Sequence, residues 1–200
     1  MKLFLNTTSP YARVIRIFLQ ERGLSDCVEL VWCDPWSDDE QLLRENPVGK
    51  IPALVTDSGI PISESLLIAN YLNDLGQGQN LIPIDRKDAI YHLTGLGQGL
   101  MDASFTTVIS RKYSGNEEDS QVLGQRRQRA IQRTLQRLEG NIDQHSDTAL
   151  SLGDIVVAVA LDYLLFRLPE LDSANQFPGL EAWRKNITQR PSFESTAFKQ

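Results

Sequence analysis

Cysteine and histidine are scarce in this sequence, and the few that occur form no recognisable site. The two cysteines, Cys27 and Cys33, have neither the C-x-x-C spacing of a redox pair nor the number that a disulfide framework needs. We expect both to be buried thiols in a reducing cytoplasm. The two histidines, His92 and His145, lie far apart in the sequence with no ligand pattern nearby. We therefore expect no metal ligand set and no histidine-based catalytic site.

Long apolar runs and an excess of positive charge are lacking as well. A membrane-spanning helix needs about 18 or more consecutive apolar residues, and the sequence has no such run. The start, MKLFLNTTSP, has too short an apolar part for a signal peptide. The 26 acidic side chains outnumber the 20 basic ones and give a formal net charge of −6, which disfavours a surface for nucleic acid or anionic membranes. We expect a cytoplasmic globular protein with neither among its partners.

What the sequence does contain is an alternation of strand-like and helix-like stretches over residues 1–77. Short apolar runs predict strands at 2–5, 28–33, 51–56 and 60–62. Apolar residues at helical spacing predict helices from Pro10 to a stop at Gly23, at 37–46 and at 63–76. The order βαβαββα predicts a parallel first strand pair with a right-handed crossover, and a hairpin between the last two strands.

The second part of the sequence is predicted to be helical throughout. Gly, Gln, Asn and Pro gather in residues 76–88, which predicts a linker at about 78–86. Helical patterns follow at 86–111, 117–139, 153–168 and 179–189, and we assign 87–200 to an all-α domain. Ser151-x-x-Asp154 precedes an apolar run and has the form of a capping box, which is a structural feature.

The segment SPYAR (9–13) places a hydroxyl at a helix start. Ser9 suits the N-cap, and Pro10 suits the first helical residue because the N–H of that residue needs no partner. Unpaired amides and the positive end of the helix dipole converge at such a place, which favours an anion. A plain helix cap is the simpler interpretation of the segment.

Four segments occur in an order and at a spacing that resemble the soluble glutathione S-transferase family. They are SPYAR, NPVGKIPAL (46–54), SES (63–65) and SLGDI (151–155). Two further segments, GLMDASF (99–105) and DYLLFRLPE (162–170), resemble the bacterial YibF-like branch of that family. The resemblance implies an α/β thioredoxin-like N-terminal domain, an all-α C-terminal domain and a homodimer.

The resemblance also implies a glutathione site on the second and third of these segments. In the family the bond before the proline is cis, so that Ile51 and Pro52, with Lys50 before them, would bind the cysteinyl part of glutathione through the main chain. Ser65 would hold the γ-glutamyl carboxylate at a helix start, and Glu64 would face the ammonium group.

Ordinary structural interpretations stand beside these roles. Most X–Pro bonds are trans, and an Ile-Pro pair can simply begin a strand. Ser63 can cap the third helix, with Glu64 favoured by the helix dipole. Asp102, which the resemblance suggests as a second partner of the ammonium from across the dimer boundary, can equally be solvated or paired with an arginine.

The resemblance gives Ser9 a chemical role. The thioredoxin fold commonly carries Cys-Pro-x-Cys where this sequence has Ser-Pro-Tyr-Ala at 9–12, so the reacting sulfur would come from glutathione. A free thiol of pKa about 8.5 is only a few per cent ionised at neutral pH. A hydrogen bond to an anion, of about 1.5–3 kcal/mol, and a helix N-terminus, of roughly 0.3–1 kcal/mol, suffice to lower that pKa by about two units. Ser9 is expected to stabilise the thiolate, with Thr8 and Tyr11 as alternatives.

The expected activity is that of a glutathione transferase, which conjugates glutathione to a small electrophile or uses it to reduce one, with a possible peroxidase side activity. Glutathione is then a co-substrate, and no cofactor is bound permanently. The electrophile pocket is predicted to involve Tyr11, Trp36, Phe105, Ile109 and Tyr113. The alternative is a binding or assembly protein of the same fold with little or no catalysis, like the stringent-starvation and elongation-factor relatives of the family.

Overall fold

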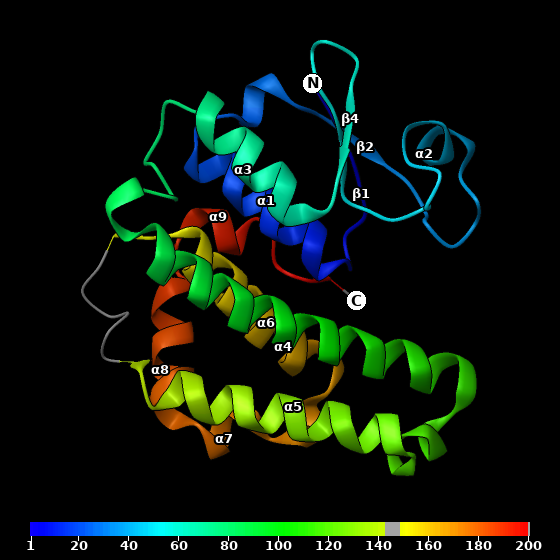
Figure 1. Cartoon of the computed structure of the whole chain (residues 1–200), viewed down its shortest axis with the longest axis vertical. Coiled ribbons are helices and arrows are strands. Elements are labelled where there is room, and N and C mark those ends of the chain that lie inside the picture. Colours follow the sequence, from blue (N-terminus) through cyan, green and yellow to red (C-terminus); the bar gives the residue numbers. More distant parts are fainter. Residues whose placement is uncertain (143–148, 200) are drawn as a thin grey trace. The chain divides into compact units, whose positions relative to one another are not determined.

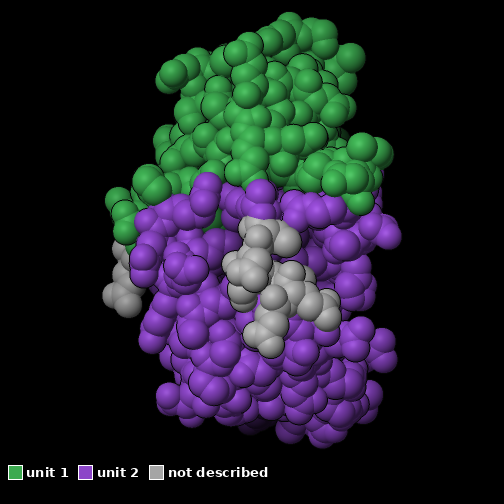
Figure 2. All heavy atoms as spheres, turned by 90° about the vertical axis from the view of Figure 1, so that its left-hand side faces the viewer, with its two compact units in different colours: residues 1–85, 191–200 green, residues 86–190 purple. Residues whose placement is uncertain are grey.

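The computed structural model describes residues 1–142 and 149–199, so His145 lies outside the described residues. The chain forms two compact units, residues 1–85 with 191–200 and residues 86–190 (Figure 2). This division differs from the predicted one, which was 1–77, a linker at about 78–86 and 87–200. The first unit extends through nearly all of the predicted linker, and it also includes residues 191–200.

A four-stranded sheet forms the centre of the first unit. Its strands are β1 (Lys2–Leu5), β2 (Glu29–Trp32), β3 (Ala53–Val55) and β4 (Pro61–Ser63), in the order β2-β1-β3-β4. β1 is parallel to β2 and antiparallel to β3, and β3 pairs with β4 in an antiparallel hairpin. The predicted order βαβαββα, with its parallel first pair and its final hairpin, is confirmed.

Helices cover both faces of this sheet. α1 (Pro10–Glu21) and α3 (Ser65–Leu75) lie together on one side, and α2 (Glu40–Glu45) lies on the other (Figure 1). Phe4 packs with Leu42 of α2 in one apolar cluster. Because side chains alternate between the faces of a strand, Leu3 and Leu5 point to the opposite face, where both are fully buried. Both faces of β1 are therefore buried.

α1 ends in a Schellman motif. The amide of Leu24 donates to the carbonyl of Leu19 at 2.8 Å, and the amide of Gly23 donates to the carbonyl of Gln20 at 3.1 Å. Gly23 has a φ of +66°, a conformation that glycine adopts without a steric penalty. The predicted helix stop at Gly23 is confirmed.

The expectation that both cysteines are buried is wrong. Cys27 is exposed and Cys33 is half-buried. Cys27 belongs to the single-turn 3-10 helix η1 (Ser25–Cys27), which precedes β2 and buries none of its residues. Cys33 directly follows β2, which is an edge strand, so only part of its side chain reaches the cluster around Phe4.

The segment after α3 is tied to the end of α1. The guanidinium of Arg22 donates to the carbonyls of Asn73, Gly76 and Gly78. A Cβ atom at Gly78 would lie 2.4 Å from the carbonyl oxygen of Glu21, so the close approach requires glycine. These contacts explain why the glycine-rich stretch belongs to the first unit rather than to a free linker. The single turn η2 (Ile84–Arg86) follows it.

The last residues of the chain also pack on α1, and they include α9 (Pro191–Glu194) (Figure 1). Ser192 donates to the carboxylate of Glu21 at 2.6 Å, and Arg13 donates to the carbonyl of Phe193 at 3.3 Å. Phe193 is fully buried. The predicted all-α domain 87–200 therefore loses its last residues to the first unit.

The second unit is helical in its described residues. Its elements are α4 (Lys87–Ser114), η3 (Asn116–Ser120), α5 (Val122–Glu139), α6 (Leu152–Arg167), η5 (Pro169–Leu171), α7 (Ser173–Gln176) and α8 (Pro178–Ile187). α4 and α6 cross closely at two glycines. A Cβ at Gly97 would lie 2.8 Å from the amide nitrogen of Val157, and one at Gly153 would lie 2.9 Å from the Cβ of Leu93.

α6 is the central helix of this unit and is buried along most of its length. The predicted capping box at its start is confirmed, because Ser151 Oγ accepts from the amide of Asp154 and the Asp154 carboxylate accepts from the amide of Ser151 at 2.8 Å. With 16 residues, α6 is shorter than a bilayer-spanning helix, which needs about 20. Among residues 1–142 and 149–199, no helix has both the length and the apolar character to cross a membrane.

Candidate functional site

The start of α1 presents the hydroxyl of Ser9, as predicted. Ser9 is the N-cap, with φ −73° and ψ 122°, and its Oγ accepts a hydrogen bond from the amide of Ala12 at 3.2 Å. Ser9 as a whole is only 9% exposed. In the described part of the chain the Ser9 hydroxyl donates to no acceptor. Its oxygen is therefore held by the helix while its proton remains available to a ligand.

Asn6 holds the turn in front of Ser9, and the sequence interpretation did not single it out. The side-chain oxygen of Asn6 accepts from the amide of Thr8 at 3.2 Å and from the amide of Ser9 at 2.8 Å. This is an Asx turn, in which an asparagine side chain bonds the main chain two and three residues onward. The signal was present in the sequence as an asparagine at the end of a strand, just before a helix cap.

A second arm of the site is the loop before β3. The bond between Ile51 and Pro52 is cis, as the resemblance implied. Neither the amide nor the carbonyl of Ile51 has a hydrogen-bond partner among the described residues. Pro52 is buried and Ile51 is half-buried, so the two peptide groups around Ile51 lie at the edge of the packed structure.

Asn46 shapes this loop and was also missed as a functional candidate. Its side-chain nitrogen donates to the carbonyl of Lys50 at 2.8 Å, and its side-chain oxygen accepts from the amide of Val48 at 3.3 Å. Asn46 is 4% exposed, so these bonds are shielded from water. Lys50 itself is exposed. The Asn-Pro dipeptide at 46–47 marked a turn, but not the burial of its asparagine.

The start of α3 forms the third arm, and here the alternative interpretation of Ser63 as a helix cap is wrong. Ser63 does not cap the helix, because it is the last residue of β4 and pairs with Ala53. The N-cap position belongs to Glu64, which has φ +70° and ψ 117° and makes no side-chain capping bond. A non-glycine residue at such a φ is strained, and strain of this kind gathers at functional sites.

Two amides at the start of α3 have no partner among the described residues. Leu67 and Ile68 donate to the carbonyl of Glu64. The amides of Ser65 and Leu66 have no partner within the described residues, and neither does the hydroxyl of Ser65, although Ser65 is only 4% exposed. Unpaired amides, an unused hydroxyl and the positive end of the helix dipole together suit a carboxylate.

The residues predicted for the electrophile pocket come from both units. Tyr11 is half-buried on α1, and Trp36 lies in the segment after β2 with 54% of its surface exposed. Phe105, Ile109 and Tyr113 lie on α4 in the second unit.

The three α4 residues share one face of that helix. They recur every four residues, and residues so spaced lie above one another on a helix. Asp102, one turn before Phe105, accepts from the side chain of Gln98 at 3.1 Å. Phe105 and Ile109 are half-buried, and Tyr113 is exposed. α4 therefore presents a partly apolar face with a carboxylate at one end.

Candidates for metal binding or thiol chemistry do not gather into a further site. No group of three His, Cys, Asp or Glu side chains in the described part of the chain is arranged to hold a metal ion. His92 is exposed on α4. The Cys33 thiol lies 3.7 Å from the carbonyl of Leu5, and its burial, followed by the charge of Asp39, raises its pKa. Such a thiol is less reactive than an exposed one.

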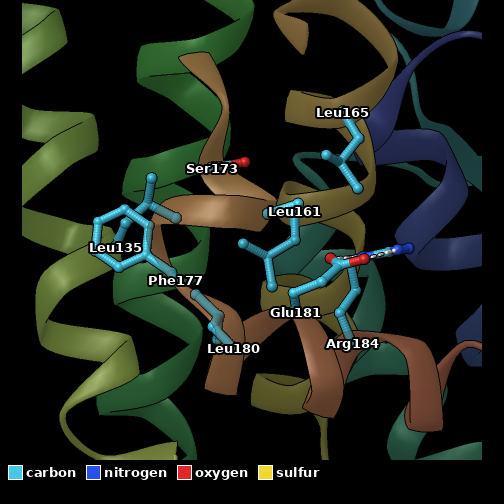
Figure 3. A pocket seen from close by; sticks show the side chains of 9 residues that line it. Leu135, Leu161, Leu165, Ser173, Phe177, Leu180, Glu181 and Arg184 are labelled. Carbon is cyan, nitrogen blue, oxygen red and sulfur yellow. Dashed lines mark hydrogen bonds and ion pairs between the residues drawn. The ribbon is translucent and has the colours of Figure 1, made fainter. Parts of the chain in front are cut away.

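A small cavity in the second unit is too small for a substrate (Figure 3). Its volume is about 10 Å³, which is about the room that one water molecule needs. Arg184 lies at its edge between Glu181 and Asp162, each 2.7 Å away. The hydrogen bond from Arg184 is the main cause that lowers the pKa of Glu181. This ion-pair cluster joins α6 to α8 and has a structural role. The residues that line the cavity are Leu135, Leu161, Leu165, Ser173, Ala174, Phe177, Leu180, Glu181 and Arg184.

Two protein-family models match this chain. The family model of the glutathione S-transferase N-terminal domain matches residues 8–75, and that of the glutathione S-transferase C-terminal domain matches residues 121–186. The uncharacterized GST-like protein YibF of Escherichia coli strain K12 is 30% identical over 202 residues, which cover 98% of this chain and 98% of that protein.

Solved structures extend the similarity to the whole chain. A glutathione transferase family member from Pseudomonas fluorescens Pf-5, solved with bound glutathione, superposes with a TM-score of 0.91 at 34% identity. The match covers 100% of this chain and 99% of that one. A glutathione S-transferase from Methylobacillus flagellatus KT with glutathione bound gives a TM-score of 0.88 at 29% identity, over 98% of both chains.

Proposed function

Since the chain belongs to the glutathione S-transferase family, we propose that it is a glutathione transferase with Ser9 as the residue that stabilises the thiolate of bound glutathione. Glutathione serves as a co-substrate and is conjugated to a small electrophile or used to reduce one. The observation that carries this proposal is the buried Ser9 hydroxyl, whose oxygen is fixed by Ala12 and whose proton has no acceptor in the described chain.

Ser9 acts on the thiol by hydrogen bonding rather than as a nucleophile. Its hydroxyl donates to the sulfur, and the amides at the start of α1 add the field of the helix N-terminus. Because the Ser9 hydroxyl is a neutral donor, it can stabilise the thiolate without first losing its own proton. Thr8 and Tyr11, the second residue of α1, carry the hydroxyl groups that would replace Ser9 in this role.

The remaining parts of glutathione are assigned to the other two arms. The main chain of Ile51, next to the cis bond to Pro52 and after Lys50, binds the cysteinyl part as an added strand would. Ser65 and the unused amides at the start of α3 bind the γ-glutamyl carboxylate. Glu64, held at φ +70°, faces the ammonium group.

Five residues are assigned to the binding of the electrophile. These are Tyr11, Trp36, Phe105, Ile109 and Tyr113, and their aromatic and aliphatic surfaces suit a small apolar electrophile. We further propose a homodimer with two-fold symmetry, in which Asp102 of one subunit meets the ammonium group bound to the other. A peroxidase side activity uses the same thiolate.

The test of the proposed function is the pH dependence of turnover in Ser9→Ala, with glutathione and an aryl chloride electrophile. Loss of one hydrogen bond to the thiolate raises the pKa of the bound thiol by about one to two units. Because only the thiolate reacts, the pH–rate profile moves to higher pH by that amount. At a pH above both pKa values, the two enzymes approach the same rate.

Ser151→Ala is the matched control. It also removes an N-cap serine, so it lowers stability as Ser9→Ala does, by roughly 0.5–2 kcal/mol, but it lies in the second unit. Its pH–rate profile should equal that of the wild type. An unchanged profile in Ser9→Ala would move the role to Thr8 or Tyr11, and a wild type that binds no glutathione would favour the binding or assembly function instead.

A further inference from the structure

We propose that Asn6 is a positioning residue that directs the Ser9 hydroxyl at the thiol of glutathione, an inference that rests on the proposed function of Ser9. Asn6 is half-buried and lies directly after β1. Its side-chain oxygen accepts from the amide of Ser9 at 2.8 Å and from the amide of Thr8 at 3.2 Å. It does not cap the helix itself, because its partners precede the first helical residue, Pro10.

Ser9 is held at three atoms. Its Oγ accepts from Ala12, its carbonyl accepts from the amide of Arg13 at 3.1 Å, and its amide donates to Asn6. The first two partners belong to α1 and move with it. Among the described residues, Asn6 supplies the one hydrogen bond to Ser9 from outside the helix. Because Asn6 directly follows β1, its hydrogen bond to the Ser9 amide fixes the orientation of the Ser9 hydroxyl relative to the sheet.

The direction of the hydroxyl matters because hydrogen bonds weaken steeply as the donor angle departs from linear. Ser9 has an extended conformation, with ψ 122°, whereas the helix begins at the next residue. Without the bond to Asn6, rotation about the bonds of the turn 6–9 turns the hydroxyl away from a ligand fixed by other parts of the first unit. The hydrogen bond from the Ala12 amide fixes the distance of Ser9 Oγ from the helix. It does not fix the direction in which the Ser9 hydroxyl points.

Asparagine also suits this place electrostatically. The main-chain N–H groups of Thr8 and Ser9 both point at the same end of the Asn6 side chain. That end must therefore be the oxygen of the side-chain amide. The acceptor is neutral, so it holds the turn without adding a negative charge beside a thiolate. An aspartate would hold the same two amides but would oppose the anion.

The experiment is a double-mutant cycle of Asn6→Leu and Ser9→Ala, read by the pKa of the enzyme-bound glutathione thiol from its thiolate absorbance. Asn6→Leu removes the acceptor at nearly constant volume, and we expect the bound thiol pKa to rise by about 0.5 to 1 unit. Below both pKa values kcat then falls by roughly three- to tenfold. The KM for glutathione changes little, because the other contacts of the ligand remain.

The cycle separates positioning from a structural role. If Asn6 acts through the Ser9 hydroxyl, Asn6→Leu adds no further pKa shift in a Ser9→Ala background, so the two effects are not additive. The control is Asn73→Leu, which removes a side-chain oxygen that accepts from the amide of Leu81 at 3.2 Å. It lowers stability at a half-buried site of the same unit and leaves the thiol pKa unchanged. If Asn6→Leu fails to fold, Asn6→Ala removes the same acceptor with less bulk.

Two results overturn the inference, and they are distinguishable. If Ser9→Ala leaves the bound thiol pKa at its wild-type value, both the role of Ser9 and the positioning by Asn6 are wrong. If Ser9→Ala raises it but Asn6→Leu does not, or if the two shifts simply add, the role of Ser9 stands and the positioning by Asn6 is refuted.

Discussion

Substitution of Ser65 by alanine separates ligand binding from folding. The Ser65 hydroxyl has no partner among the described residues, and the helix it begins has no side-chain cap. Its removal therefore breaks no bond within the described part of the protein. Alanine is also a slightly better helix former than serine. We expect the stability of Ser65→Ala to equal or slightly exceed that of the wild type.

The loss of glutathione affinity follows from one hydrogen bond. A hydrogen bond to a charged group contributes about 1.5–3 kcal/mol, so removal of the hydroxyl raises the Kd by roughly 10- to 150-fold. Binding is not abolished, because the amides of residues 65 and 66 and the helix dipole remain in the variant. Ser65→Thr retains a hydroxyl and should retain most of the affinity.

Calorimetric titration with two ligands tests this reasoning. Cysteinylglycine lacks the γ-glutamyl residue, so its affinity should be the same for the wild type and Ser65→Ala. Ser63→Ala is the matched control, since Ser63 lies two residues earlier in the same strand-to-helix connection but at the end of β4. Glutathione should bind it as tightly as it binds the wild type.

Two outcomes would refute the placement of the carboxylate at α3. One is an unchanged glutathione affinity in Ser65→Ala. The other is an equal loss of affinity for glutathione and for cysteinylglycine, which would mean that the substitution disturbs the whole site. A loss confined to Ser63→Ala would assign the carboxylate to the hydroxyl of Ser63 instead.

Two further predictions concern stability and assembly. The hydrogen bond from Arg184 lowers the pKa of Glu181 from its ordinary value, so the carboxylate stabilises the fold above the pKa of the unfolded state and loses this effect as the pH falls through the folded-state pKa. Glu181→Gln should lower Tm at neutral pH, with the difference vanishing in acid. Light scattering at micromolar concentration should give twice the chain mass of 22.5 kDa; a monomeric mass would reject the dimer, whereas unchanged glutathione binding in Asp102→Asn would remove only Asp102.

The features that the sequence predicted well depend on near neighbours in the chain. The Ser9 cap, the stop at Gly23 and the capping box at Ser151 each involve residues within five positions of one another. The order of strands and helices along residues 1–77 followed from the alternation of short apolar runs with helical patterns. Local rules determine such features, so the sequence alone is enough.

The cap of α3 shows why other predictions failed. Ser63 matched the local pattern of a cap, yet its pairing with Ala53 extends β4 to that residue. The helix then starts after Glu64, at a φ that a local rule does not assign to a glutamate. A contact between strands overrode the preference of a single residue.

The end of the chain and Asn46 are two further features that local sequence patterns do not predict. Ser192 bonds to Glu21 across 171 residues of sequence, so no local pattern reveals that the last residues belong to the first unit. The side chain of Asn46 bonds to the main chain of its own loop, at Lys50 and Val48. Its role follows from its burial, which the Asn-Pro turn signal does not convey.

The most direct measurement of the chemistry proposed here is a crystal structure of the protein with glutathione bound. We expect the ligand sulfur to lie within hydrogen-bond distance of Ser9 Oγ, with the Asn6–Ser9 hydrogen bond retained. A sulfur bonded instead to the hydroxyl of Thr8 or Tyr11, with Ser9 bonded only to Ala12, would contradict the role of Ser9.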